Sequence, residues 1–117
     1  MTLHQPIAIT GMGIVSSIGH CINEFNMSLK RGRCGISFLE NKSDVAISVK
    51  IGAEIKNFSY NSNLEKNATI KRDIIDKARH CALRSPRSIQ ISVVAALEAW
   101  KEAGLNECQV DPERMYM

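Results

Sequence analysis

Two stretches of the chain have the hydrophobic pattern of β-strands. Residues 7–10 (IAIT) form a short apolar run between a proline and a glycine, which predicts a strand buried on both faces. Residues 44–55 predict a half-buried strand, because polar residues alternate there with Val45, Ile47, Val49 and Ile51. The next stretch, residues 57–67 (NFSYNSNLEKN), is rich in Asn and Ser and predicts a flexible loop.

Three further stretches have the spacing of helices. They cover residues 22–31, residues 68–83 and a segment that starts at Ser85 and Pro86 and ends before Gly104. From Ser88 to Leu97 the third helix has no charged residue, so it is apolar nearly all round and should be buried on most sides. We therefore expect more protein to cover it, and the final residues, DPERMYM, to lead into another strand.

Composition and length place the chain among ordinary globular domains. With 117 residues, 44% hydrophobic and 23% charged, it is one domain at most. It has no apolar run long enough for a membrane span and no signal-peptide pattern, which predicts a cytoplasmic location. Its four cysteines and three histidines are scattered, and no spacing among them suits zinc, so we expect neither a metal nor a cofactor.

The glycine-rich stretch ITGMGIVSSIG raises the question of nucleotide binding. Gly11, Gly13 and Gly19 follow a predicted strand and precede a predicted helix, as in dinucleotide-binding proteins. The third glycine comes three residues too late for the GxGxxG fingerprint, and there is no GxxxxGK[ST] loop. A nucleotide-binding module is thus a remote alternative, and the glycines are expected to serve a tight turn and close backbone packing.

The same stretch, together with LKRGRCGIS and SVVAALEAWKEAGL, resembles the N-terminal part of β-ketoacyl synthases. The resemblance covers nearly all of residues 1–117 and implies an α/β fold, the N-terminal portion of a thiolase-like αβαβα layered domain that is incomplete in this chain. In that family a cysteine accepts an acyl group and a decarboxylative Claisen condensation follows. The motifs that perform this chemistry would lie beyond Met117, so no catalytic residue is assigned here and the chain alone is expected to be inactive. Cys34 stands where the family usually has Ser and is interpreted as structural.

Two pathways remain open under this resemblance, because the family serves both fatty acid and polyketide biosynthesis. The segment 57–85 is longer than in the plain fatty-acid enzymes and is more similar to ketosynthase-like proteins of polyketide pathways. Some of those proteins only decarboxylate, with the nucleophilic cysteine replaced, and others are non-catalytic partner subunits. The residue at the nucleophile position of the complete protein would separate condensation from decarboxylation.

Positive charge is concentrated between residues 71 and 87, where six Lys or Arg face two Asp, a local net charge of +4. Acyl carrier proteins are acidic, and basic residues at this place in the family resemble their docking patch. Arg79, Arg84 and Arg87 are therefore candidate contacts with a carrier protein, and a solvated helix face is the alternative. The segment lacks the interleaved aromatic residues of a nucleic-acid site. The resemblance also implies a homodimer or heterodimer in the complete protein.

Overall fold

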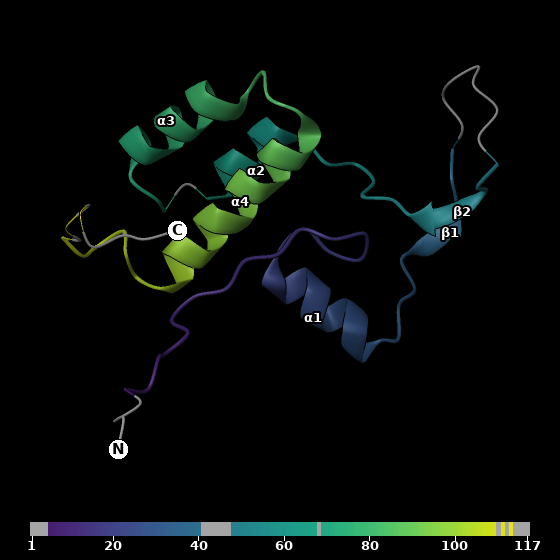
Figure 1. The fold of residues 1–117 in the computed structure, drawn as a ribbon, viewed down its shortest axis with the longest axis horizontal. Helices are drawn as coiled ribbons and strands as arrows, with labels where there is room; N and C mark the ends of the chain where they lie inside the picture. The colour runs from purple at the N-terminus through teal and green to yellow at the C-terminus, as the bar shows by residue number, and fades with distance from the viewer. Residues whose placement is uncertain (1–4, 41–47, 68, 110, 112, 114–117) are drawn as a thin grey trace.

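The computed structural model describes residues 5–40, 48–67, 69–109, 111 and 113. An irregular segment leads from residue 5 into a tight turn at Ser16–Gly19, whose two end residues form an isolated antiparallel bridge. Four helices and a two-stranded antiparallel sheet follow (Figure 1): α1 (Ile22–Lys30), β1 (Ile36–Phe38), β2 (Ile51–Ala53), α2 (Tyr60–Lys66), α3 (Arg72–Ala82) and α4 (Arg87–Glu102).

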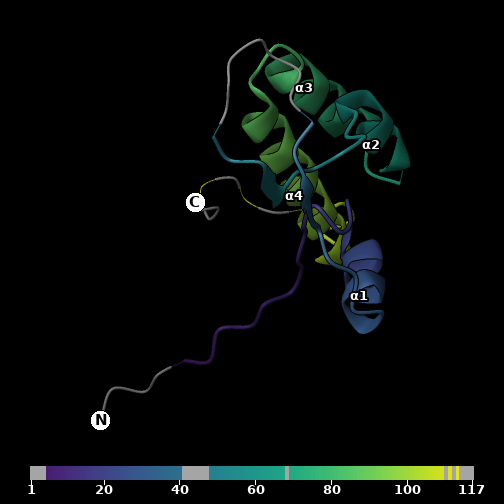
Figure 2. The ribbon, with the colours of Figure 1, turned by 90° about the vertical axis from the view of Figure 1, so that its right-hand side faces the viewer.

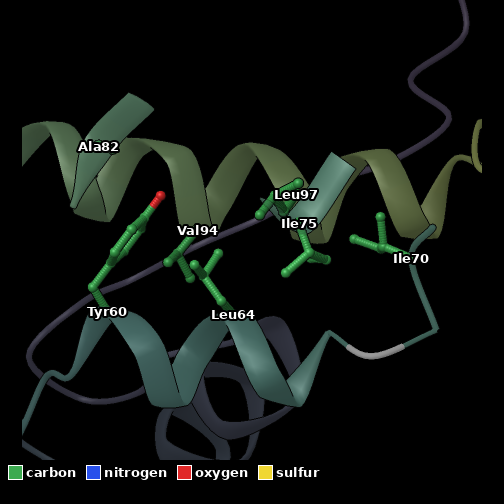
Figure 3. Packing of buried hydrophobic residues seen from close by; sticks show 7 residues of the cluster. All are labelled: Tyr60, Leu64, Ile70, Ile75, Ala82, Val94 and Leu97. Atoms are coloured by element: carbon green, nitrogen blue, oxygen red, sulfur yellow. The ribbon is translucent and has the colours of Figure 1, made fainter. Parts of the chain in front are cut away.

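The hydrophobic core lies between helices α2, α3 and α4. Figure 3 shows side chains from all three helices, and from the connection before α3, converging on Leu64, which is 0% exposed. The buried apolar residues are Tyr60, Leu64, Ile70, Ile75, Ala82, Val94 and Leu97. Burial of this apolar surface is what holds three short helices together, since helices of this length are marginal in isolation.

Helix α2 replaces the flexible loop predicted for residues 57–67, so that prediction was wrong. The helix starts behind Ser59, whose hydroxyl accepts a hydrogen bond from the Ser62 N–H at 3.5 Å. Asn63 donates from its side-chain amide to the Ser59 carbonyl at 2.8 Å. The Asn and Ser that suggested a loop thus serve as a cap and as internal hydrogen-bond donors, while Tyr60 and Leu64 supply the buried face.

The other three helices are confirmed, with ends shifted by one or a few residues. The two glycines expected to end helices do so: Gly32 follows α1 with φ of +64° and Gly104 follows α4 with φ of +70°. Such positive φ values are readily adopted by glycine because it has no Cβ. At the start of α4, Pro86 is the cap residue in place of the expected Ser85.

Helix α4 is buried on fewer sides than its composition predicts. Val94 and Leu97 lie in the core, and the backbone of Ala95 and Ala99 packs against the glycine turn. A third side, with Ile89, Ser92 and Ala96, is exposed. In the part of the chain that the structure describes, α2 and α3 cover one side and the N-terminal segment another, which leaves no element for the third.

The predicted strands differ most from the structure. Residues 7–10 form no strand and are exposed, because no neighbouring strand pairs with them among the described residues; Figure 2 shows this segment leading away from α4. Within 44–55 only β2 is a strand, and residues 44–47 lie outside the described residues. Its partner β1 was not predicted, and the register pairs Ile36 with Ala53 and Phe38 with Ile51. The observed architecture is a small mixed helix-and-sheet fold.

Candidate functional site

The basic segment 71–87 forms the α3–α4 corner of the molecule. Arg79 lies in the last turn of α3, Arg84 in the connection and Arg87 at the first position of α4. The three predicted docking residues therefore lie on either side of the connection between α3 and α4. Their environments differ.

Arg79 is partly used within its own helix. Its Nη1 lies 3.3 Å from Oδ1 of Asp76, one turn earlier, and its side chain is 34% exposed. An exposed pair of this kind contributes little to stability, and it competes only weakly with an external carboxylate. Arg79 is thus still able to contact an acidic partner.

Arg87 is engaged much more fully. Its Nη2 donates a hydrogen bond to the Ile55 carbonyl, and its guanidinium carbon lies 5.6 Å from the centre of the Phe58 ring. These contacts tie residues 55–58 to the start of α4, since a guanidinium can stack on an aromatic ring and donate in its plane at the same time. We interpret Arg87 as a residue that holds the corner together.

Arg84 is exposed, and with the described residues it forms no ion pair or side-chain hydrogen bond. It lines a shallow hollow of about 390 Å³ with Arg79, His80 and Leu83. Leu83 is 46% exposed, so the hollow combines an apolar side chain with positive charge. Such a surface suits an acidic partner that also presents an apolar residue.

The corner is held in place by two side chains that the sequence analysis missed. Gln90 of α4 donates to the carbonyls of Ala82 and Leu83 at 3.1 and 3.0 Å, and the Ser85 hydroxyl donates to the Cys81 carbonyl at 3.3 Å. They satisfy the last carbonyls of α3, which have no partner within the helix. Gln90, a polar residue one turn into the largely apolar α4, was the sequence feature that could have indicated this contact.

The glycine turn packs directly on helix α4. A Cβ added to Gly13 would overlap the carbonyl of Ala95, and one added to Gly11 would lie 2.8 Å from the Ala103 nitrogen. Gly19 packs on the first turn of α1, where an added Cβ would lie 2.5 Å from the Phe25 nitrogen. At all three positions the missing Cβ permits close backbone contact.

The amides of this turn are bound by carboxylates of the chain itself. Met12 N–H donates to Glu102 Oε2 at 2.6 Å, and Ile14 N–H donates to Glu98 Oε2 at 3.0 Å. Ile22 N–H, at the start of α1, donates to the second oxygen of Glu98 at 2.8 Å. These amides are not free to cradle a phosphate, which removes the main support for the nucleotide-binding alternative. Glu98 and Glu102 were missed because nothing in their spacing links them to the turn.

Other chemistry is sparse among the described residues. No group of three His, Cys, Asp or Glu side chains there could hold a metal ion. Described helices include none that is both long and apolar enough to cross a membrane. The four cysteines are free thiols, and Cys34 is exposed. Burial raises the pKa of the Tyr60 phenol, whose hydroxyl donates to the Ala78 carbonyl at 2.7 Å.

Comparison with known proteins decides the family. The family model described as the N-terminal domain of β-ketoacyl synthase matches residues 4–117, almost the whole chain. The chain belongs to the β-ketoacyl synthase family. No solved structure is a significant match to it.

Curated relatives of this β-ketoacyl synthase domain come from both pathways. It is 34% identical over 106 residues to 3-oxoacyl-acyl-carrier-protein synthase 2 of Staphylococcus aureus. The aligned segment covers 91% of the chain and 22% of that protein. It is 30% identical over 101 residues to the polyketide biosynthesis malonyl-ACP decarboxylase PksF of Bacillus subtilis, covering 86% of the chain and 21% of the relative. The chain therefore spans about a fifth of the length of these relatives.

Proposed function

We propose that this domain is the N-terminal part of a β-ketoacyl-acyl-carrier-protein synthase of fatty acid or polyketide biosynthesis. Family membership over residues 4–117 is the observation that carries the proposal. The complete enzyme would have the thiolase-like layered fold, act as a cytoplasmic dimer, and extend a carrier-bound acyl chain by decarboxylative condensation. The glycine turn and α4 would contribute architecture to that fold, with no reacting group in the described residues.

A decarboxylating enzyme is the second candidate, because a relative of that name matches 86% of the chain. The two candidates differ at the nucleophile position that the family resemblance places beyond residue 117. A cysteine there favours condensation, and a serine favours decarboxylation. Reading the coding sequence beyond that point, and assaying the encoded protein with malonyl and acyl carrier proteins, separates the two candidates.

We also propose that the α3–α4 corner docks the acidic acyl carrier protein. Support comes from the hollow lined by Arg79, His80, Leu83 and Arg84, in which Arg84 is exposed and Gln90 fixes the backbone. In this proposal Arg84 makes the main charged contact and Arg79 a secondary one. Arg87 acts indirectly, by holding residues 55–58 against the start of α4.

Charge reversal tests the docking proposal. Arg84→Glu should weaken binding of an acyl carrier protein about tenfold, because a favourable charge contact becomes repulsive. Arg72→Glu is the matched control, since it reverses the same charge at the first position of α3, away from the corner, and is exposed. Fluorescence anisotropy with a labelled carrier protein at low and high salt measures both. An equal loss of affinity in the two variants would show that binding depends on overall positive charge and not on the corner. No loss of affinity with Arg84→Glu would disprove docking at the corner.

A further inference from the structure

The outer edge of strand β2 is open in the structure. Strand β1 occupies the other edge, and no third strand among the described residues joins the sheet. Figure 1 shows the hairpin lying apart from the helices, and neither strand contacts a described helix. An open strand edge presents backbone N–H and C=O groups that can pair with another strand. The hairpin is therefore able to accept a further strand.

The backbone groups of Ile51 and Ala53 face this open edge. The Leu39 N–H donates to the Lys50 carbonyl at 2.9 Å, so Lys50 is hydrogen-bonded to the chain of β1. Backbone groups alternate between the two edges along a strand, so those of Gly52 also face β1 and those of Ile51 and Ala53 face outward. Two residues of β2 thus offer the N–H and C=O groups that a neighbouring antiparallel strand needs.

The sequence across β2 is complementary to itself when read in opposite directions. Residues 50–54 are KIGAE, with Lys50 and Glu54 equally far from Gly52. When two copies of β2 pair about Gly52, each Lys50 lies opposite Glu54 of the second copy, and each Ile51 lies opposite Ala53. The charged residues then occupy non-hydrogen-bonded positions, where facing side chains of an antiparallel pair are closest. Two identical strands therefore form two ion pairs across the edge.

The charges also select this register over its neighbours. The outward backbone groups meet only when the register shifts in steps of two residues. A centre at Ala53 would place Lys50 opposite Lys56 of the second copy, and a centre at Ile51 would place Lys50 opposite Gly52. Lys50 is exposed, and with the described residues neither it nor Glu54 forms an ion pair inside the chain. Both charges are thus available to a second copy, and only pairing about Gly52 matches them.

We propose that two copies of this chain pair through β2 and form a four-stranded antiparallel sheet of order β1–β2–β2–β1. The interface is isologous, with its two-fold axis at Gly52. It places Ile36, Phe38 and Ile51 of both copies on one face of a wider sheet, whereas the isolated hairpin leaves them exposed. One pair of short strands is a small interface, so the dimer is weak and depends on concentration. It depends neither on carrier binding nor on the proposed enzyme activity.

Charge reversal and charge exchange test this interface in the full chain. Lys50→Glu and Glu54→Lys each place like charges opposite one another, and each should raise the dissociation constant of the dimer about tenfold or more. The variant with both changes restores opposite charges and should recover the wild-type value. Lys77→Glu is the matched control, since it is exposed on α3, which does not contact the hairpin, and it should dimerise as the wild type does. Sedimentation equilibrium over a concentration series measures all four variants.

Three results of these measurements would overturn the proposal. A wild-type chain that stays monomeric over the series would show that the two charges keep the edge free. A dimer that neither single reversal weakens would lie elsewhere on the molecule. Failure of the double exchange to restore a dimer that both single reversals had weakened would show that the two charges do not face each other.

Hydrogen exchange in the wild-type chain gives a second measurement that needs no variant. Exchange at the Ile51 and Ala53 amides should slow as the protein concentration rises, because these N–H groups become hydrogen-bonded only in the dimer. The Gly52 amide faces β1 and should change much less. Exchange at Ile51 and Ala53 that is independent of concentration, in a chain that dimerises, would exclude pairing through this edge.

Discussion

The described residues of the helical region, 60–67 and 69–103, and of the N-terminal region, 5–40 and 48–57, bury their apolar side chains very differently. In the helical region Leu64 is 0% exposed and six more apolar residues surround it. In the N-terminal region Ile7 is 95% exposed and Phe38 is 75% exposed. Both regions have clear hydrophobic patterns in the sequence, so the pattern alone does not explain the difference.

The two regions differ in what their apolar faces can reach. Helices α2, α3 and α4 contact one another pairwise, so each apolar stripe meets another. The β1–β2 hairpin has Ile36, Phe38 and Ile51 on one face, because paired residues of an antiparallel sheet share a face, and all three are exposed. Two strands cannot bury a face by themselves.

The N-terminal region is attached through its backbone more than through side chains. Glycines bring residues 11–13 against α4, and two α4 carboxylates hold the amides of Met12 and Ile14. The resulting molecule is extended: its radius of gyration is 17.5 Å, whereas a compact chain of this length has about 13 Å. The N-terminal region thus differs from the core in being held by backbone hydrogen bonds, with no described element covering its apolar side chains.

The largest expected effect is at the centre of the helical region. Leu64→Ala should reduce the free energy of unfolding by about 2–5 kcal/mol, since it removes a fully buried side chain and leaves a cavity. Urea unfolding followed by far-ultraviolet circular dichroism measures the loss. Because a small domain is stable by only about 5–15 kcal/mol, this loss is a large fraction of the total stability.

Ile9→Ala is the matched change in the N-terminal region. Ile9 is 82% exposed, so the same kind of truncation should alter the free energy of unfolding by less than about 0.5 kcal/mol. A loss at Ile9 similar to that at Leu64 would show that residues 7–10 are buried in solution. The contrast between the two regions would then fail.

An effect smaller than that of Leu64→Ala is expected at Tyr60, another residue of the same core. Burial is the main cause that raises the pKa of this phenol, and the nearby Cys81 adds to the shift while Arg79 opposes it. The neutral phenol is therefore favoured in the folded chain. Its contribution is complete below the unfolded pKa of about 10 and is lost as the pH rises through the higher folded value.

Tyr60→Phe checks both parts of this argument. At neutral pH it should cost about 1 kcal/mol, because the hydrogen bond to the Ala78 carbonyl is lost. Above pH of about 10 the wild-type chain should lose stability more steeply than the variant. Parallel pH profiles of the two unfolding free energies would contradict the assignment of this titration to Tyr60.

Sequence patterns predicted three of the four helices because each carries its own local signals. The start of α4 behind Pro86 and its end before Gly104 are examples, and both depend only on neighbouring residues. Helix α2 was missed because Asn and Ser are frequent in loops, although Tyr60 and Leu64 have helical spacing. The competing composition signal was given too much weight.

The candidate site was predictable only in part, for a related reason. Charge density and the family resemblance pointed to Arg79, Arg84 and Arg87 as candidates. Charge density does not distinguish Arg84, which has no side-chain partner among the described residues, from Arg87, which lies over the Phe58 ring. Glu98 and Gln90 act across α4 on segments up to 84 residues away. Contacts of that range depend on the assembled fold, so no local pattern predicts them. The strand predicted at residues 7–10 failed likewise, because pairing requires a second strand.

A small effect is also expected at Trp100, the one described residue with a buried side-chain nitrogen or oxygen that has no hydrogen-bond partner in the structure. An unpaired buried donor costs stability, so replacing it by an apolar group of similar shape can be neutral or favourable. Trp100→Phe removes the indole N–H and retains an aromatic ring. We expect the free energy of unfolding to change by less than about 1 kcal/mol. Urea unfolding of the variant beside the wild-type chain measures the change. A loss well above that value would show that the indole N–H has a partner in solution, and the core of the helical region would then extend further along α4 than the described contacts indicate.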